Sequence, residues 1–302
     1  MRARLIINAD DFGLTPGINR SIEELHRAGV LRSATLMANG PAFQDALTVA
    51  NRNASLGVGC HVVLTDGLPV SPPESIPSLL GSDGRSFRPS LLQFASAAVL
   101  GQLREQDICT EALAQIRKLQ DAGLSVTHLD THKHAHLFPA VSRPLFDAAR
   151  QTSVPAIRYP FEPPWSLGRA SGARDRQMEV RLLNRLKPRF HAAFNLHHGL
   201  LATTDGTIGI AATGHLDEPV LRDLLQNLPE GTWELVCHPG YRDPDLDLVR
   251  TRLRTHRDIE RKALLDVVPQ VLSRPDAPSL IHYGDLPRGF APGSALSSHR
   301  RP

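Results

Sequence analysis

The sequence is poor in cysteine, in aromatic residues and in long apolar runs, and each shortage excludes a class of protein. Its three cysteines, Cys60, Cys109 and Cys237, form no CxxC pair and suggest no disulfide framework, so we expect a reducing compartment. Aromatic residues make up 5% of the 302 residues and no block of Lys and Arg alternates with them, which argues against nucleic acid. No stretch approaches the roughly 18 apolar residues of a transmembrane helix. The short apolar start is interrupted at once by Asp10 and Asp11, so no signal peptide is indicated. These absences predict a cytoplasmic protein. Because the formal charge of +3 favours attraction to anionic lipid, peripheral contact with the inner membrane is an alternative.

What the sequence does have is a regular alternation of apolar strands and amphipathic helices. We expect strands at 5–9, 33–37, 56–64, 126–130, 156–159, 233–238 and 279–283, with a further strand and turns within 200–213. We expect helices at 16–28, 43–50, 91–123 with a break near Gly101, 138–152, 176–190, 218–228 and 255–272. Such alternation predicts a parallel sheet with helical crossovers, and about seven units favour a barrel over an open sheet.

The domain organisation follows from this count. We predict one α/β domain over residues 1–287, with a barrel-like, TIM-barrel-like fold of about seven parallel strands. The stretch 66–90 is rich in Pro, Gly and Ser and is expected to form a long loop. The segment 288–302, with its Gly, Pro, Ser and Arg residues, is expected to be a disordered tail.

Two polar clusters follow expected strands and stand far apart in the sequence. The stretch 127–136 (THLDTHKHAH) holds four of the 14 histidines, and histidine is the commonest ligand of zinc. Alone, this stretch is equally compatible with a histidine-rich surface loop. At the end of the first strand, Asp10 and Asp11 are adjacent. Helix capping accounts for one carboxylate there, whereas two in a tight turn repel each other unless a cation binds. Together the clusters indicate two halves of one metal site.

In a parallel barrel the carboxyl ends of the strands share one face, and active sites lie on that face. The polar residues that end the expected strands are Asp10, Asp11, His61, Asp130, His132, Arg158 and His238. For His61 alone, a hydrogen-bonded core histidine is the commoner case, and Arg158 has an alternative role as an ion-pair partner of Asp10 or Asp130. Other histidines are expected to lie in loops or to make hydrogen bonds without binding metal: His197, His198, His215 and His282.

These motifs resemble those of the YdjC-like carbohydrate deacetylases, relatives of the chitooligosaccharide deacetylases. The matching segments are 8–13, 33–41, 57–61, 127–139 and 237–239. Variants at 69–73, 158–164 and 212–215 resemble one branch, the hopanoid-biosynthesis-associated deacetylases. The resemblance implies a barrel-like α/β fold and a metal bound by Asp11, His61 and His132. The role of His132 as a ligand, ahead of His134 and His136, is implied by the resemblance alone.

The resemblance also implies an activity and its substrate. The expected reaction is hydrolysis of the N-acetyl group of an N-acetylglucosamine-type sugar, with a glycosylated hopanoid lipid as the expected carrier. A chitooligosaccharide substrate and a phosphoesterase on the same fold are the alternatives. One carboxylate and two imidazoles leave coordination positions open, as catalytic sites do, and suit Zn²⁺ best, with Mg²⁺ or Co²⁺ as alternatives. Asp10 is expected to accept a proton from water, and His238 to protonate the leaving amine.

Further residues are expected to support this site or to contact the substrate. Asp130 and Arg158 would orient a ligand imidazole or the base. The other candidates are His134 and His136 for ligand orientation or sugar contact, and Phe12 and Trp165 for stacking on sugar. The segment around Trp165 and the basic helix at 176–189 are candidates for lipid contact, although a solvated basic face is equally compatible. An N-acetylated sugar or glycolipid is thus the expected partner, nucleic acid is not, and a homodimer is compatible with the sequence.

Overall fold

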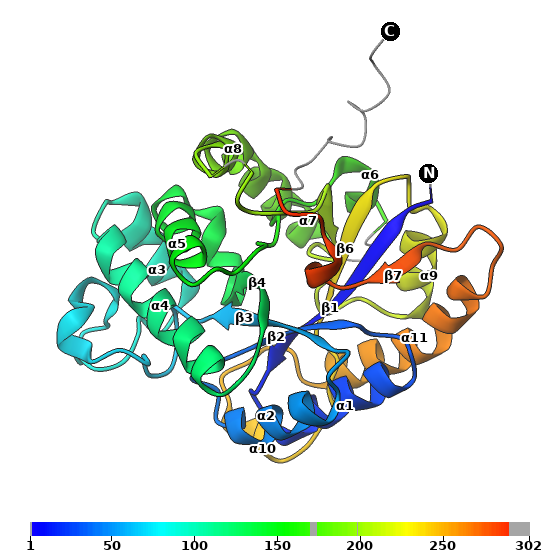
Figure 1. The fold of residues 1–302 in the computed structure, drawn as a ribbon, viewed down its shortest axis with the longest axis horizontal. Helices are drawn as coiled ribbons and strands as arrows, with labels where there is room; N and C mark the ends of the chain where they lie inside the picture. Colours follow the sequence, from blue (N-terminus) through cyan, green and yellow to red (C-terminus); the bar gives the residue numbers. More distant parts are fainter. Residues whose placement is uncertain (1, 170–173, 198, 290–302) are drawn as a thin grey trace, which may run out of the picture.

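The strand that carries the two aspartates, β1 (Arg4–Phe12), lies in the middle of a curled parallel sheet (Figure 1). The computed structural model describes residues 2–169, 174–197 and 199–289. Within them the strand order is β4-β3-β2-β1-β6-β5, and β7 also pairs with β1. The other strands are β2 (Ser33–Leu36), β3 (Gly57–Val62), β4 (Val126–Thr131), β5 (Gly206–Ile208), β6 (Thr232–Cys237) and β7 (Ser279–Ile281). The predicted barrel-like α/β fold with about seven parallel strands is therefore confirmed.

The helices cover the outside of the sheet. In Figure 1, α1 (Pro16–Arg27), α2 (Phe43–Arg52) and α11 (Thr255–Leu272) lie on one side of the sheet. On another side α3 (Leu91–Val99), α4 (Glu105–Asp121) and α5 (Pro139–Gln151) pack beyond β3 and β4. The remaining helices are α6 (Pro164–Leu167), α7 (Arg174–Leu183), α8 (Lys187–Asn195), α9 (Glu218–Gln226) and α10 (Asp245–Leu248). Because helices cover it, β1 is buried from Leu5 to Phe12, which explains its continuous apolar start.

Two expected elements differ in the structure. The run 156–159 is not a strand but makes single parallel bridges, from Ile157 to Leu129 of β4 and from Ala156 to Ala202. The expected helix at 176–190 is divided into α7 and α8 by a short 3-10 turn, Asn184–Leu186. Pro188 lies in the first turn of α8, where its missing amide hydrogen costs no helix hydrogen bond, whereas inside one continuous helix it would remove one. The expected tail lies mainly outside the described residues.

The long loop at 66–90 is held against α4 by buried side chains. Glu111 is fully buried and accepts hydrogen bonds from the backbone amides of Val70 and Ser71, each at 2.9 Å. Four residues earlier, Asp107 accepts from the amide of Ser78 at 2.8 Å. Two short 3-10 turns, Pro73–Ser75 and Pro77–Leu79, lie within the loop. The loop therefore has a defined path beside the carboxyl end of β3.

None of the helices in the described part of the chain combines the length and the apolar character needed to cross a bilayer.

Candidate metal centre and active site

A bulge at the end of β1 brings the adjacent carboxylates into one site. Ala9 pairs with Ala34 and Phe12 with Leu36, so three steps along β1 match two along β2. Side chains alternate faces in a regular strand, and a bulge breaks that alternation, often beside active sites. Asp11 has a φ of 64°, in the left-handed region that non-glycine residues rarely adopt. The bulge therefore turns Asp10 and Asp11 so that both carboxylates reach His61.

The turn after this bulge is fixed by a buried asparagine of α1. Asn19 accepts a hydrogen bond from the amide of Gly13 at 2.7 Å and donates to the carbonyl of Ala42 at 3.1 Å. Gly13 has a φ of 89°, and a Cβ there would lie 2.8 Å from a methyl carbon of Leu36. Only glycine fits this position without a shift of its neighbours. The turn thus fixes how β1 leads into α1 directly after the aspartates.

Asp11, His61 and His132 form the first group of possible metal ligands. Their nearest ligand atoms all lie within 4.8 Å of one another. The Oδ1 atom of Asp11 is 3.5 Å from Nε2 of His61 and 3.2 Å from Nδ1 of His132. This oxygen is buried and has no hydrogen-bond partner among the described residues. A buried carboxylate oxygen between two ring nitrogens fits a divalent cation bound by one oxygen and two nitrogens.

The orientation of His61 supports this fit. Nδ1 of His61 lies 2.7 Å from Oδ1 of Asp130, so its hydrogen points to that carboxylate and Nε2 is left to face Asp11. Burial alone would lower the pKa of His61, but the charges of Asp130 and Asp10 and its hydrogen bonds raise it to about 10. The surrounding carboxylates therefore favour positive charge at this place, and a bound cation would supply that charge in place of the proton.

Asp10 faces the interior of the barrel and is held by Arg158. Nη1 of Arg158 donates to Oδ2 of Asp10 at 2.8 Å, and Nη2 donates to Oδ1 at 2.6 Å. The same buried guanidinium lies 2.6 Å from Asp130 and 2.7 Å from Glu234. Burial raises the pKa of Asp10, but the charges of Arg158, His61 and His238 and the hydrogen bond from Arg158 together outweigh burial, so the pKa lies well below its usual range. The ion-pair partners anticipated for Arg158, Asp10 and Asp130, are both present, and Glu234 is a third.

His238 follows β6 and lies beside Asp10. Its Nε2 is 3.9 Å from Oδ2 of Asp10, and its backbone amide donates to Oε2 of Glu260 at 2.6 Å. Burial lowers the pKa of His238 to about 4, although the charges of Asp10 and Asp11 partly oppose this shift. The imidazole is therefore neutral near pH 7.

His134 and His136 lie in a strained segment after His132. Lys133 and His134 have φ values of 57° and 52°, which fold the chain back on itself. The Thr131 hydroxyl accepts from the amide of His136 at 3.0 Å and lies 2.6 Å from its Nδ1. His136 has no exposed surface, so it supports the segment that carries His132 and does not present a face to a sugar. His134 is also buried.

The two aromatic residues expected to stack on sugar are placed otherwise. Phe12 has no exposed surface and belongs to the hydrophobic core, because β1 is covered on both faces. Trp165 packs edge-on against Trp233 with ring centroids 5.4 Å apart. Trp233 pairs with Leu5 near the start of β1, at the end of the sheet opposite Asp11. In this conformation neither ring is available at the carboxyl end of the sheet.

Three charged residues of the site were not anticipated from the sequence. Nη2 of Arg257, on α11, donates to Oδ2 of Asp11 at 2.5 Å. Glu260, one turn later, accepts from the amide of His238, and burial raises its pKa to about 7. Glu234 of β6 accepts from Nε of Arg158 at 2.9 Å and from the hydroxyl of Tyr283 at 2.6 Å. The position of Glu234 inside an apolar strand is a sequence signal that it is buried. The helix α11 contains many charged residues, so its sequence does not show that Arg257 and Glu260 are the buried ones.

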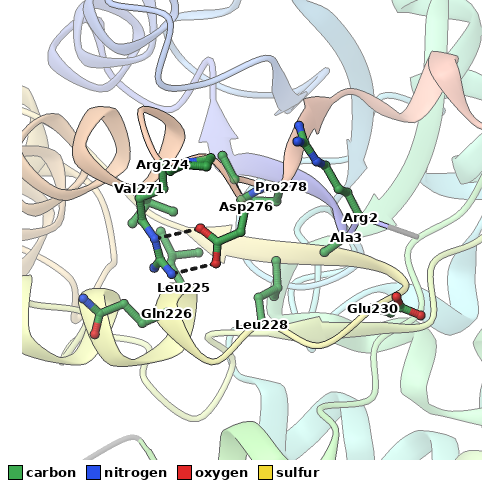
Figure 2. Close-up of a pocket in the computed structure, with 12 residues that line it drawn as sticks. Arg2, Ala3, Leu225, Gln226, Leu228, Glu230, Val271, Arg274, Asp276 and Pro278 are labelled. Carbon is green, nitrogen blue, oxygen red and sulfur yellow. Dashed lines mark hydrogen bonds and ion pairs between the residues drawn. The ribbon is translucent and has the colours of Figure 1, made fainter.

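A hollow at the surface of the described structure lies away from these residues. It has a volume of about 470 Å³ and lies at the start of β1, beside Arg2 and Ala3. Figure 2 shows Arg274 paired there with Asp276, at distances of 2.8 and 3.1 Å. This is the amino end of the sheet, whereas Asp11, His61 and His132 follow the carboxyl ends. The hollow is therefore distinct from the candidate metal centre.

Comparison with known proteins places this arrangement in a family. Residues 4–272 match the profile of the family described as YdjC-like protein. The chain belongs to the YdjC-like family. A relative from Thermoanaerobacter pseudethanolicus, named carbohydrate deacetylase, is 30% identical over 265 residues, covering 87% of this chain and 90% of that protein. Another carbohydrate deacetylase, from Brevibacillus brevis, is 42% identical over 158 residues, which is 52% of this chain but only 60% of that protein.

The YdjC-like fold is also recognisable among solved structures. A protein of Enterococcus faecalis, described as a candidate cellobiose-phosphate cleavage protein, superposes with a TM-score of 0.71. The alignment covers 94% of this chain and 98% of that one at 24% sequence identity. At this identity the similarity shows a shared fold and carries no statement about substrate.

Proposed function

We propose that this protein is a metal-dependent carbohydrate N-deacetylase that hydrolyses the N-acetyl group of an N-acetylglucosamine-type sugar. The observation that carries the proposal is the convergence of Asp11, His61 and His132 beside the pair formed by Asp10 and His238. The names of its relatives, carbohydrate deacetylases, support the same reaction class. The proposed ion is Zn²⁺, with Mg²⁺ or Co²⁺ as alternatives, because two imidazoles and one carboxylate suit zinc best.

In this proposal Asp11, His61 and His132 hold the ion. When bound, a divalent ion supplies Lewis acidity toward the amide carbonyl and lowers the pKa of water. Asp130 keeps Nε2 of His61 free for the ion by accepting the hydrogen of Nδ1 at 2.7 Å. The open side of the centre lies next to His132, whose side chain is 19% exposed and is the only one of the three with substantial access to solvent.

Proton transfer is assigned to Asp10 and His238. Asp10, kept ionised by Arg158, accepts a proton from the attacking water as the new C–O bond forms. His238 is neutral at rest and lies 3.9 Å away, so in this proposal it receives this proton through one bridging water and delivers it to the amine nitrogen as the C–N bond breaks. An unprotonated amine is a poor leaving group, which is why the site needs a donor as well as an acceptor. The products are acetate and the free amino sugar.

The carrier of the sugar is proposed to be a glycosylated hopanoid, on the motif variants that resemble the hopanoid-associated branch. Exposed apolar residues on and after α3 are compatible with an amphiphilic substrate. Leu92, Val99 and Leu100 are at least 69% exposed on and just after α3, within a stretch, 89–103, that contains no charged residue. Phe94 of α3 packs against Phe138, which ends the segment that carries His132. A cytoplasmic site of action belongs to the same proposal.

Acetate release decides between the substrates. The protein, stripped with chelator and then reloaded with zinc, would be assayed side by side with an N-acetylglucosaminyl hopanoid and with N,N′-diacetylchitobiose. We expect zinc-dependent release from the lipid. Release from chitobiose alone would keep the deacetylase and reject the hopanoid. No release from either, despite bound metal, would overturn the proposed reaction.

A phosphoesterase with two metal ions is less compatible with the site. The second group of possible ligands among the described residues, Asp10, His61 and Asp130, shares His61 with the first. Both of its carboxylates are bound by the guanidinium of Arg158. A second cation bound by this group would therefore be repelled by the positive charge of Arg158. Metal analysis of the zinc-loaded protein should give one ion per chain.

A further inference from the structure

Arg257 contacts the proposed metal ligand Asp11 through one oxygen only. Its Nη2 donates to Oδ2 of Asp11 at 2.5 Å, while Oδ1 of the same carboxylate faces the nitrogens of His61 and His132. The guanidinium side chain is 1% exposed, so water does not weaken this ion pair. The two oxygens of Asp11 thus have separate partners: one is bound by an arginine and the other points into the metal centre.

The position of Arg257 is fixed by the chain around it. Nε of Arg257 donates to the carbonyl of Leu253 at 3.1 Å, and its own carbonyl accepts from the amide of Gly240 at 3.2 Å. A Cβ at Gly240 would lie 3.2 Å from Cδ of Arg257, so the segment after β6 passes directly over the arginine stem. Glu260, on the same helix, binds the amide of His238 in that segment. The arginine is therefore positioned by its Nε, by its Nη2 on Asp11 and by the backbone around it, while its buried Nη1 has no hydrogen-bond partner among the described residues.

We propose that Arg257 is a positioning residue that reserves Oδ2 of Asp11 and thereby limits Asp11 to a single ligand oxygen. A carboxylate can bind an ion through one oxygen or two. Binding through both would fill a coordination position that a catalytic site leaves open to water and substrate. With Oδ2 occupied by Arg257, the three ligands supply three donor atoms and the open positions are preserved. The inference rests on the proposed metal site but not on the identity of the substrate.

Replacing zinc with cobalt distinguishes binding of Asp11 through one oxygen from binding through two. Four- and five-coordinate Co²⁺ absorbs visible light much more strongly than six-coordinate Co²⁺. The wild-type protein should give an intense spectrum, against which the absorption of each variant is compared. In Arg257→Met both oxygens of Asp11 become free, so absorption per bound cobalt should fall at least twofold. The rate constant kcat should fall about tenfold or more with KM little changed.

Arg261→Met is the matched control. Arg261 lies one turn further along α11 and pairs with Glu24 and Asp258, at 2.9 and 2.8 Å, away from the metal ligands. Its loss removes the same kind of side chain and should leave the cobalt spectrum and kcat unchanged. Arg257→Lys, which keeps a cationic donor, should recover part of both. An unchanged spectrum in folded Arg257→Met would refute the positioning role, as would an equal change in Arg261→Met.

The outcomes separate this inference from the proposed function. A wild-type protein that binds no cobalt would overturn both the metal site and the role of Arg257. Cobalt binding with the expected spectral change, but no acetate release from any N-acetylated sugar, would leave the inference standing and reject the deacetylase.

Discussion

The two neighbouring aspartates at the end of β1 are each bound by a buried arginine, yet the two ion pairs leave them with different chemistry. Arg158 lies inside the barrel and binds both oxygens of Asp10. Arg257 lies on the helix side and binds one oxygen of Asp11, leaving the other to face two imidazoles. A carboxylate with one oxygen free can bind a cation, whereas one with both oxygens on a guanidinium stays ionised but already has a positive partner. The residue type is the same, and the geometry of the arginine decides the role.

Inside the barrel, one arginine balances the charge of several buried carboxylates. Arg158 is the shared partner of three buried carboxylates, those of Asp10, Asp130 and Glu234. Burial raises the pKa of Glu234, although Arg158 and Tyr283 oppose the shift. The outer side has fewer charges and opens toward His132. Removal of Arg158 and removal of Arg257 should therefore lower the free energy of unfolding by different amounts.

The largest effect is expected for Arg158→Met. The substitution leaves three buried carboxylates without their cation, and breaking a buried ion pair by removing one partner costs about 3–5 kcal/mol of unfolding free energy. Urea unfolding followed by circular dichroism measures this loss. Arg257→Met should lose less, because it frees a single oxygen of Asp11. Equal destabilisation by the two variants would contradict the difference described for the two arginines.

A smaller and more specific effect is expected from exchanging each carboxylate for its amide. Asp11→Asn should weaken metal binding about 10–100-fold or more, since it removes the anionic ligand, and activity should fall with it. Asp10→Asn should leave metal content unchanged and lower kcat about 100-fold or more, because an amide does not accept the proton. Metal titration together with acetate release separates the two. His238→Ala is expected to behave as Asp10→Asn does, and wild-type rates in either would remove that residue from the mechanism.

The smallest effect concerns the pKa of His136, which is buried and lies within the influence of the Arg158 charge. Burial, and after it the charge of Arg158, lowers the pKa of His136 from 6.5 to about 3. Below pH 6.5 the unfolded chain takes up a proton that folded His136 does not, so the free energy of unfolding falls as the pH falls toward 3. One such group contributes about 1.4 kcal/mol per pH unit. Urea midpoints measured at pH 6.5 and pH 5 should therefore differ less in His136→Leu than in the wild type. An unchanged pH slope would show that His136 titrates normally.

Much of this architecture could be anticipated from local pattern. The continuous apolar start of β1 and the amphipathic period of α1 depend on residues close in sequence, and these elements lie where the pattern predicts them. The run 156–159 has similar residues but pairs with its neighbours through single bridges, to Leu129 and Ala202, and so forms no strand. Pro188 is the sequence signal for the division between α7 and α8. Phe12 and Trp165 were placed by residue type, which does not reveal whether a ring is covered.

The sequence by itself determined the family, the alternation of strands and helices, and the presence of carboxylates and histidines where strands end, because each of these is a property of short segments. Tertiary structure decided which atoms meet. The bulge at Asp10 and Asp11 depends on pairing with β2, and no pattern in β1 announces it. Arg257 contributes from 246 positions away, on a helix whose other charges, apart from the buried Glu260, face solvent or surface partners. Whether a charged side chain is buried beside a ligand depends on packing between distant segments, and this is why the second arginine emerged only from the folded chain.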